Sequence, residues 1–168
     1  MSRPSETAIA GLVEILAAEE RLYLELRACL QRERAAMEEL DSERLFHCVA
    51  EKEGLAAEGR VLEESRLVLA RRLAEELGLD SQRPRLADIC ERLGDGFAGL
   101  REARARLRAL VVAVTELSEA NASFAGNALA QVRRTLDLFG TASERDTTYG
   151  PPGQDPVASV GRLVHRSA

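Results

Sequence analysis

The sequence contains few aromatic residues, few prolines and almost no lysine. Its 168 residues include four Phe, two Tyr, no Trp and five Pro, and its single lysine is Lys52. The scarcity of aromatic residues leaves a core of aliphatic side chains, while few prolines and 30% charged residues argue against extended β-architecture, collagen-like sequence and wholesale disorder. The remaining composition, 45% hydrophobic and rich in Ala, Leu, Glu and Arg, predicts one all-α domain.

Basic charge and long apolar runs are also missing. The net charge is −5, from 23 basic and 28 acidic residues, so the chain has no strong basic face and nucleic acid is a poor candidate partner. No run of about 20 apolar residues occurs, which argues against membrane insertion. The first helical run contains Glu14, Glu19 and Arg21, so it cannot be the core of a signal peptide. We therefore expect a cytoplasmic protein.

Residues typical of catalytic or metal sites are few and scattered. Cys29, Cys48 and Cys90 are odd in number and widely spaced, a pattern that favours reduced, half-buried thiols over a disulfide framework or a zinc site. His47 precedes Cys48, but adjacent helical side chains point about 100° apart, and His165 stands alone. The sequence therefore predicts no enzyme, no metal and no cofactor.

The first amphipathic run predicts a helix that begins after residue 4 and ends near residue 40. Its flanking apolar row widens the stripe enough to contact two partner helices rather than one. Glu19 and Glu33 interrupt the seam, and we expect them to extend along its edge, because no histidine or third acid shares their face. The seam consists of Ile9, Leu12, Leu16, Tyr23, Leu26, Leu30, Met37 and Leu40.

A second run predicts a helix from about 42 to 78. Asp41 and Ser42 supply capping oxygens at its start, and so short a connection either folds the helix back antiparallel on the first or leaves the two continuous. Gly54 and Gly59 lie inside this helix, where each costs up to about 1 kcal/mol relative to Ala, and they mark a close crossing or a bend.

The third run predicts a helix from about 85 to 139, with Gly140 as its stop. Heptad spacing persists to Phe124 and then slips by about four residues, which indicates a stutter. Gly94 to Gly99 spell GxGxxG, but the preceding residues have helical period rather than that of a strand. We therefore interpret these glycines as a kink and not as a dinucleotide site.

Asn121 occupies a seam position among leucines, where a buried amide specifies register or partner at some cost in stability. The residues after Gly140 change character and contain most of the prolines, but they keep some apolar side chains. We expect an antiparallel bundle of three long helices over 1–140 and a flexible, partner-binding tail over 141–168.

Three groups of residues resemble the FlgN-type flagellar export chaperones. The second run contains Lys52-Glu53-x-Leu55, then Leu62-Glu63 and Arg66, similar to the family's second helix. The third run contains Leu117-x-x-x-Asn121, followed by Phe124, Asn127 and Arg133, similar to the family's C-terminal helix. The tail contains Tyr149-Gly150-Pro151-Pro152-Gly153, similar to the family's Tyr-Gly-x-x-Gly element. The resemblance covers essentially the whole chain.

The resemblance implies a cytoplasmic chaperone of a flagellar type III export system, with no cofactor and no hydrolytic activity. Such a chaperone binds hook-associated (junction) proteins of the FlgK and FlgL type, prevents their premature assembly and delivers them to the export gate. By the same resemblance, Tyr149 and Gly150 are expected to dock on the cytoplasmic domain of the export gate.

Helix lengths suggest where a client would bind. If the first helix has about 36 residues and the third about 55, the last 15 to 20 residues of an up-down-up bundle must overhang. The expected client-binding residues begin at this overhang, and replacing the first of them, Asn121, with Leu should stabilise the free bundle while impairing client discrimination. They are Asn121, Phe124, Leu129, Val132, Leu136 and Phe139.

Other interpretations remain open from the sequence. Asn121 could be an ordinary solvent-facing residue, and the overhang could fold back on its own bundle or self-associate into a homo-oligomer. The competing function is a non-catalytic coiled-coil adaptor or scaffold that permanently bridges two proteins and has no export role.

Overall fold

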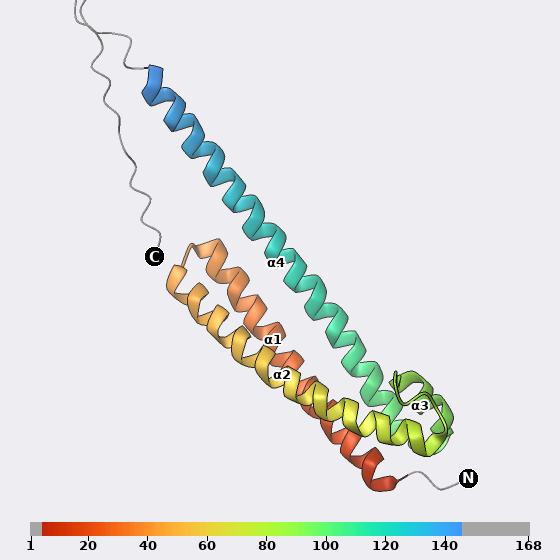
Figure 1. Cartoon of the computed structure of the whole chain (residues 1–168). Coiled ribbons are helices and arrows are strands. Elements are labelled where there is room, and N and C mark those ends of the chain that lie inside the picture. The colour runs from red at the N-terminus through yellow and green to blue at the C-terminus, as the bar shows by residue number, and fades with distance from the viewer. Residues whose placement is uncertain (1–4, 146–168) are drawn as a thin grey trace, which may run out of the picture. The chain divides into compact units, whose positions relative to one another are not determined.

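A computed structural model describes residues 5–145, and of residues 95–96 and 140–145 it describes the backbone only (Figure 1). The described chain is all-α and contains no strand. It divides into two compact units, Met1–Gly126 and Asn127–Ala168. The elements are α1 (Glu6–Glu39), α2 (Ser42–Leu77), α3 (Leu86–Leu93), the short 3-10 helix η1 (Gly94–Phe97) and α4 (Ala98–Arg145).

A tight connection joins α1 to α2, where the sequence predicted it. Leu40 ends α1 in the left-handed conformation, with φ of 57°, and its N–H donates to the carbonyls of Ala36 and Met37. Asp41 then caps α2 by accepting a hydrogen bond of 3.0 Å from the N–H of Arg44. Both caps satisfy backbone groups that a helix end would otherwise leave without partners.

The two helices form an antiparallel hairpin (Figure 1). Arg32 of α1 pairs with Glu51 of α2 at 2.5 Å, close to the connection. At the other end the Ser5 N–H donates to the Glu76 carboxylate at 2.8 Å. Partners late in α2 therefore face residues early in α1, which excludes the continuous alternative.

The third run differs from its predicted form at both ends. It is not one helix, because α3 ends at Gly94, whose φ of 69° and ψ of −160° suit glycine, and η1 intervenes before α4. The kink predicted at these glycines is therefore confirmed. The predicted stop at Gly140 is wrong, because the helical backbone continues to Arg145. Glycine lowers helix propensity, but it ends a helix only where the chain turns out of the helical conformation.

Apolar side chains of the first unit form two clusters. The larger joins α1, α2, α3 and the beginning of α4, and its most buried members include Leu12, Leu16, Leu73, Ile89 and Leu100. The smaller joins α1 and α2 near their connection through Leu22, Cys29, Cys48 and Leu55. The core therefore holds the hairpin along its length and fixes the start of α4 against one end of it.

A close helix approach occurs at Gly11 and not at Gly54. A Cβ built on Gly11 would lie 3.1 Å from a methyl of Leu69, whereas one built on Gly54 would meet nothing within 4 Å. At Gly59 the nearest atom would be a methyl of Leu22 at 3.7 Å, an ordinary contact. Neither glycine interrupts α2. Among residues 5–145, no helix is both long enough and apolar enough to cross a bilayer.

Candidate functional site

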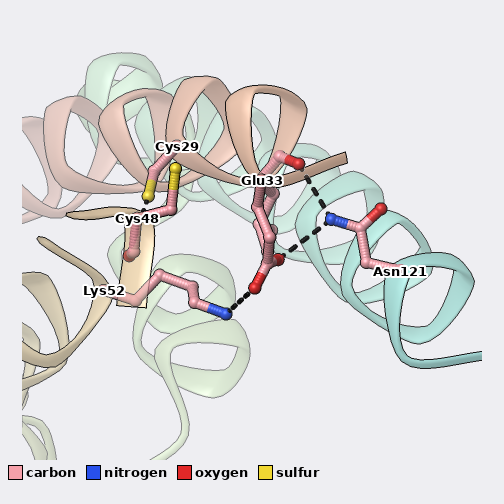
Figure 2. A network of polar contacts seen from close by, with 6 residues as sticks. Cys29, Glu33, Cys48, Lys52 and Asn121 are labelled. Atoms are coloured by element: carbon pink, nitrogen blue, oxygen red, sulfur yellow. Dashed lines mark hydrogen bonds and ion pairs between the residues drawn. The ribbon is translucent and has the colours of Figure 1, made fainter. Parts of the chain in front are cut away.

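Asn121 lies at the point where α4 contacts α1 within the first unit. Its side chain is 3% exposed, and its amide nitrogen donates to the Leu30 carbonyl at 2.8 Å and to the Glu33 carboxylate at 3.0 Å (Figure 2). The sequence prediction of a buried amide at a seam position is confirmed, and the solvent-facing alternative is excluded. Such paired contacts fix the register of α4 along α1.

The same contacts extend to α2. Glu33 is 8% exposed, and its other carboxylate oxygen accepts a hydrogen bond from the ammonium group of Lys52 (Figure 2). A buried carboxylate requires such partners because desolvation destabilises an unpaired charge. Lys52, Glu33 and Asn121 therefore form one polar network that joins three helices.

The expectation that Glu19 and Glu33 extend along the edge of the seam is wrong. Glu19 is 6% exposed and accepts a hydrogen bond of 2.9 Å from the guanidinium of Arg66. The sequence did contain a usable pattern, because Glu19 and Glu33 are 14 residues apart, as are Lys52 and Arg66. In a hairpin that turns near residue 42, opposite charges spaced in this way meet across the interface. The heptad analysis of each helix alone missed this pattern.

Phe124 also contacts α1. The guanidinium of Arg34 lies over its ring, with 3.8 Å between the guanidinium carbon and the ring centroid, and this side chain is half-buried. A cation at this distance from an aromatic face is attracted to it. Two of the six predicted client-binding residues, Asn121 and Phe124, therefore make contacts within the chain, which the sequence did not predict.

The other four are exposed on α4, in the second unit. Leu129, Val132, Leu136 and Phe139 are 52–70% exposed among the described residues, and their spacing places them on one face of the helix. Three of them line a shallow depression, together with Ala128, Gln131 and Thr135. We call these four residues the α4 apolar face. Their contact with a client, the overhang and self-association remain predictions.

The predicted docking residues Tyr149 and Gly150 lie outside the described residues, as does most of the predicted tail.

The cysteines are free and more deeply buried than predicted. Cys29, Cys48 and Cys90 are all buried rather than half-buried, and the Cys29 thiol donates to the Cys48 carbonyl at 3.4 Å (Figure 2). Burial, followed in importance by the Glu51 carboxylate, raises the pKa of Cys29 to about 11. This keeps the thiol protonated and poorly nucleophilic.

Side chains suited to metal binding do not converge either. Over the described part of the chain, no group of three or more His, Cys, Asp or Glu residues could hold a metal ion. The GxGxxG segment follows α3 rather than a strand, so it lacks the context of a dinucleotide site. The chemistry available here is therefore packing of helices through apolar and paired polar contacts.

Comparison with known proteins assigns the family. No curated protein and no solved structure matches the chain. Residues 1–156, which include nearly the whole chain, match the family described as FlgN protein. The protein is therefore a member of the FlgN family of flagellar export chaperones.

Proposed function

We propose that this chaperone acts in the cytoplasm, where it binds hook-associated (junction) proteins of the FlgK and FlgL type and prevents their premature assembly. It then delivers them to the cytoplasmic domain of the export gate. The observation that carries the proposal is the α4 apolar face, in a member of a chaperone family. Large apolar side chains lined up on one helix face favour burial against another helix.

The energetics support a helical client. Moving a large apolar side chain from water into an apolar groove contributes about 1.5 to 3 kcal/mol, so several such residues supply enough binding energy for a specific complex. Hook-associated proteins assemble through helical termini, and covering those termini would prevent assembly before export. A bound helix would replace water on the α4 apolar face without any chemical step.

The polar network positions the start of the proposed client site. Asn121 and Phe124 fix α4 against α1, and the α4 apolar face begins with Leu129, within two turns further along the helix. We propose that Asn121 acts mainly through this positioning and contributes to client discrimination, while Phe124 contributes apolar surface. Tyr149 and Gly150 are proposed to dock on the export gate, separately from the client site.

Binding to a purified hook-associated protein tests the function. We expect the chaperone and client to form a soluble complex in size-exclusion chromatography, and the client to stop polymerising when the chaperone is present. A variant truncated after residue 140 should still bind the client but should fail to support its export. Failure to bind any hook-associated protein would contradict the proposal.

The same experiment separates the chaperone from the coiled-coil adaptor. An adaptor would hold both partners permanently and would function without the tail. A chaperone must release its client, so labelled client in the complex should exchange with unlabelled client. Absence of exchange together with full function of the truncated variant would favour the adaptor.

A further inference from the structure

A groove lies between α1 and α2 within the first unit, away from the α4 apolar face. Its volume is about 320 Å³, close to the lower end of the range for small ligand-binding pockets. Leu22 and Leu26 of α1 and Leu55 of α2 supply apolar surface, and Gly59 of α2 contributes no side chain. The groove lies between the two apolar clusters of the hairpin, level with the ion pair between Glu19 and Arg66.

The groove opens on the side of α1 along which α4 runs. Glu20, Leu30 and Arg34 of α1 contact Arg106, Asn121 and Phe124 of α4, respectively. Tyr23 belongs to the same helical stripe as these α1 residues, by its spacing of three and seven residues, and it lines the groove. The lining residues all belong to α1 and α2. The hairpin alone therefore forms the groove.

One oxygen of Glu19 has an unmet hydrogen-bonding capacity in this groove. Its Oε1 accepts from Arg66 at 2.9 Å, but its Oε2 is buried and has no hydrogen-bond partner among the described residues. A buried carboxylate oxygen without a donor is unfavourable, and a ligand that brings a donor relieves this cost. Because Arg66 already balances the charge of Glu19, a neutral donor fits better than a second cation.

Gly59 keeps the groove open. A Cβ at this position would meet only methyl groups of Leu22, at 3.7 and 4.0 Å, so packing inside the chain does not require glycine here. Glycine nevertheless weakens the interior of a helix relative to alanine. A long side chain at this position would extend toward Leu22 and occupy the groove. The sequence thus keeps this space empty at some cost to helix stability.

We propose that the groove binds an aromatic side chain with a neutral hydrogen-bond donor, tyrosine or tryptophan, presented by a helix of a partner protein. The ring would pack on Leu22, Leu26 and Leu55, and its O–H or N–H would donate to Glu19 Oε2. Leu22 and Leu26 are four residues apart and follow the helix axis, which suits a second helix laid along the hairpin. This site does not depend on the client or on the α4 apolar face.

Small probes of each side chain test the chemistry first. The probes are p-cresol, which has the tyrosine hydroxyl, and toluene, which has no donor, each titrated into the isotope-labelled full chain and followed by NMR. We expect p-cresol to shift the amide signals of Leu55 and Gly59 and to bind about tenfold more tightly than toluene, because only p-cresol donates to the carboxylate. Glu19→Gln should reduce this preference, since the residue then offers one oxygen, which Arg66 uses.

Two leucine substitutions form a matched pair of variants. Gly59→Leu fills the groove and should abolish binding of p-cresol. Gly54→Leu makes the same change in the same helix, at a position where the new side chain meets open space, and should leave binding unchanged. Circular dichroism of both variants checks that the hairpin still folds.

A pair of amphipathic helical peptides then tests the partner. The two peptides differ only by Tyr or Phe at one central position, and their binding is measured by fluorescence anisotropy. We expect the Tyr peptide to bind about tenfold more tightly, and Gly59→Leu but not Gly54→Leu to abolish its binding. Equal affinity of the two peptides, binding that survives Gly59→Leu, or binding of p-cresol without binding of either peptide would overturn the proposal.

Discussion

Asn121 illustrates how buried contacts at a single residue can reverse an expectation from the sequence. Taken as a polar residue among leucines, it predicted that Asn121→Leu would stabilise the bundle. Its two hydrogen bonds change that expectation, because Leu would leave the Leu30 carbonyl without this partner and Glu33 with only Lys52. A buried acceptor without a donor costs about 1 to 3 kcal/mol, which offsets the gain from an added apolar side chain.

We therefore predict that Asn121→Leu lowers the free energy of unfolding by about 1 to 2 kcal/mol. Urea denaturation measures the change. Asn127→Leu is the control, because this exposed asparagine makes the same substitution nearby on α4 and should change stability little. An Asn121→Leu protein more stable than the wild type would show that the network is not a net contributor.

Cys29 gives the stability a predictable dependence on pH. Its pKa is about 11 in the folded chain, above that of an ordinary thiol, so the folded state retains a proton that the unfolded state loses as the pH rises past about 9. The stabilisation is fully present below that pH and is lost as the pH rises toward 11. We expect a loss of about 1 to 3 kcal/mol between pH 9 and 11.

Denaturation of the wild type and of Cys29→Ala across this range tests that prediction. The wild-type stability should fall more steeply than that of Cys29→Ala, because only the wild type carries this thiol. Parallel curves for the two proteins would assign the pH dependence to other groups.

At the scale of elements, two glycines should respond to alanine in opposite ways. Gly94 has φ of 69° and ψ of −160°, a conformation that a Cβ strains by about 1 to 3 kcal/mol. Gly54 is helical with open space around it, so alanine there should add up to about 1 kcal/mol. Thermal denaturation should therefore show a lower Tm for Gly94→Ala and a higher Tm for Gly54→Ala. A Tm for Gly94→Ala at or above that of the wild type would mean that α3 and α4 do not require this break.

The sequence predicts elements well where local chemistry decides them. The bounds of α1 and α2 follow from apolar periodicity and from the caps at Asp41 and Gly78, and the kink follows from Gly94. Gly140 was misleading because one glycine carries no information on whether the chain turns out of the helix. The pairing of Glu19 with Arg66 was missed because it depends on the register between helices, which becomes visible only when the whole hairpin is considered.

The candidate site divides in a similar way. The spacing of Leu129, Val132, Leu136 and Phe139 predicts one apolar face, which is a property of a single helix. The intramolecular contacts of Phe124 depend on Arg34, more than 80 residues earlier in the chain, and no periodicity in either segment indicates them. Local patterns thus located the exposed part of the proposed site but not the part that packs within the chain.

At the scale of the whole molecule, the proposal separates client binding from gate docking. Tyr149 lies in a segment rich in glycine and proline, so its ring could enter a pocket on another protein without disturbing the bundle. We predict that Tyr149→Ala leaves client affinity unchanged and weakens binding to the export-gate domain about thirtyfold, as loss of an aromatic anchor does at a small interface.

Two measurements on the same preparation check this separation, namely isothermal titration with a hook-associated protein and with the export-gate domain. Gate affinity equal to that of the wild type would place the docking function elsewhere in the tail or on the helices. Loss of client binding would show instead that the two functions share a surface.

Client capture by a variant of the α4 apolar face decides whether this face is the client site. Val132→Asp with Leu136→Asp places two charges on it, and Ser123→Asp with Ala130→Asp places the same two charges on the opposite, exposed side of α4 as a control. We predict that Val132→Asp with Leu136→Asp abolishes capture of a hook-associated protein, with a Tm within a few degrees of the wild type, and that the control binds normally. Normal capture by the Val132/Leu136 variant, or a bundle that melts because these residues are packed inside it, would contradict the assignment of the client site to α4.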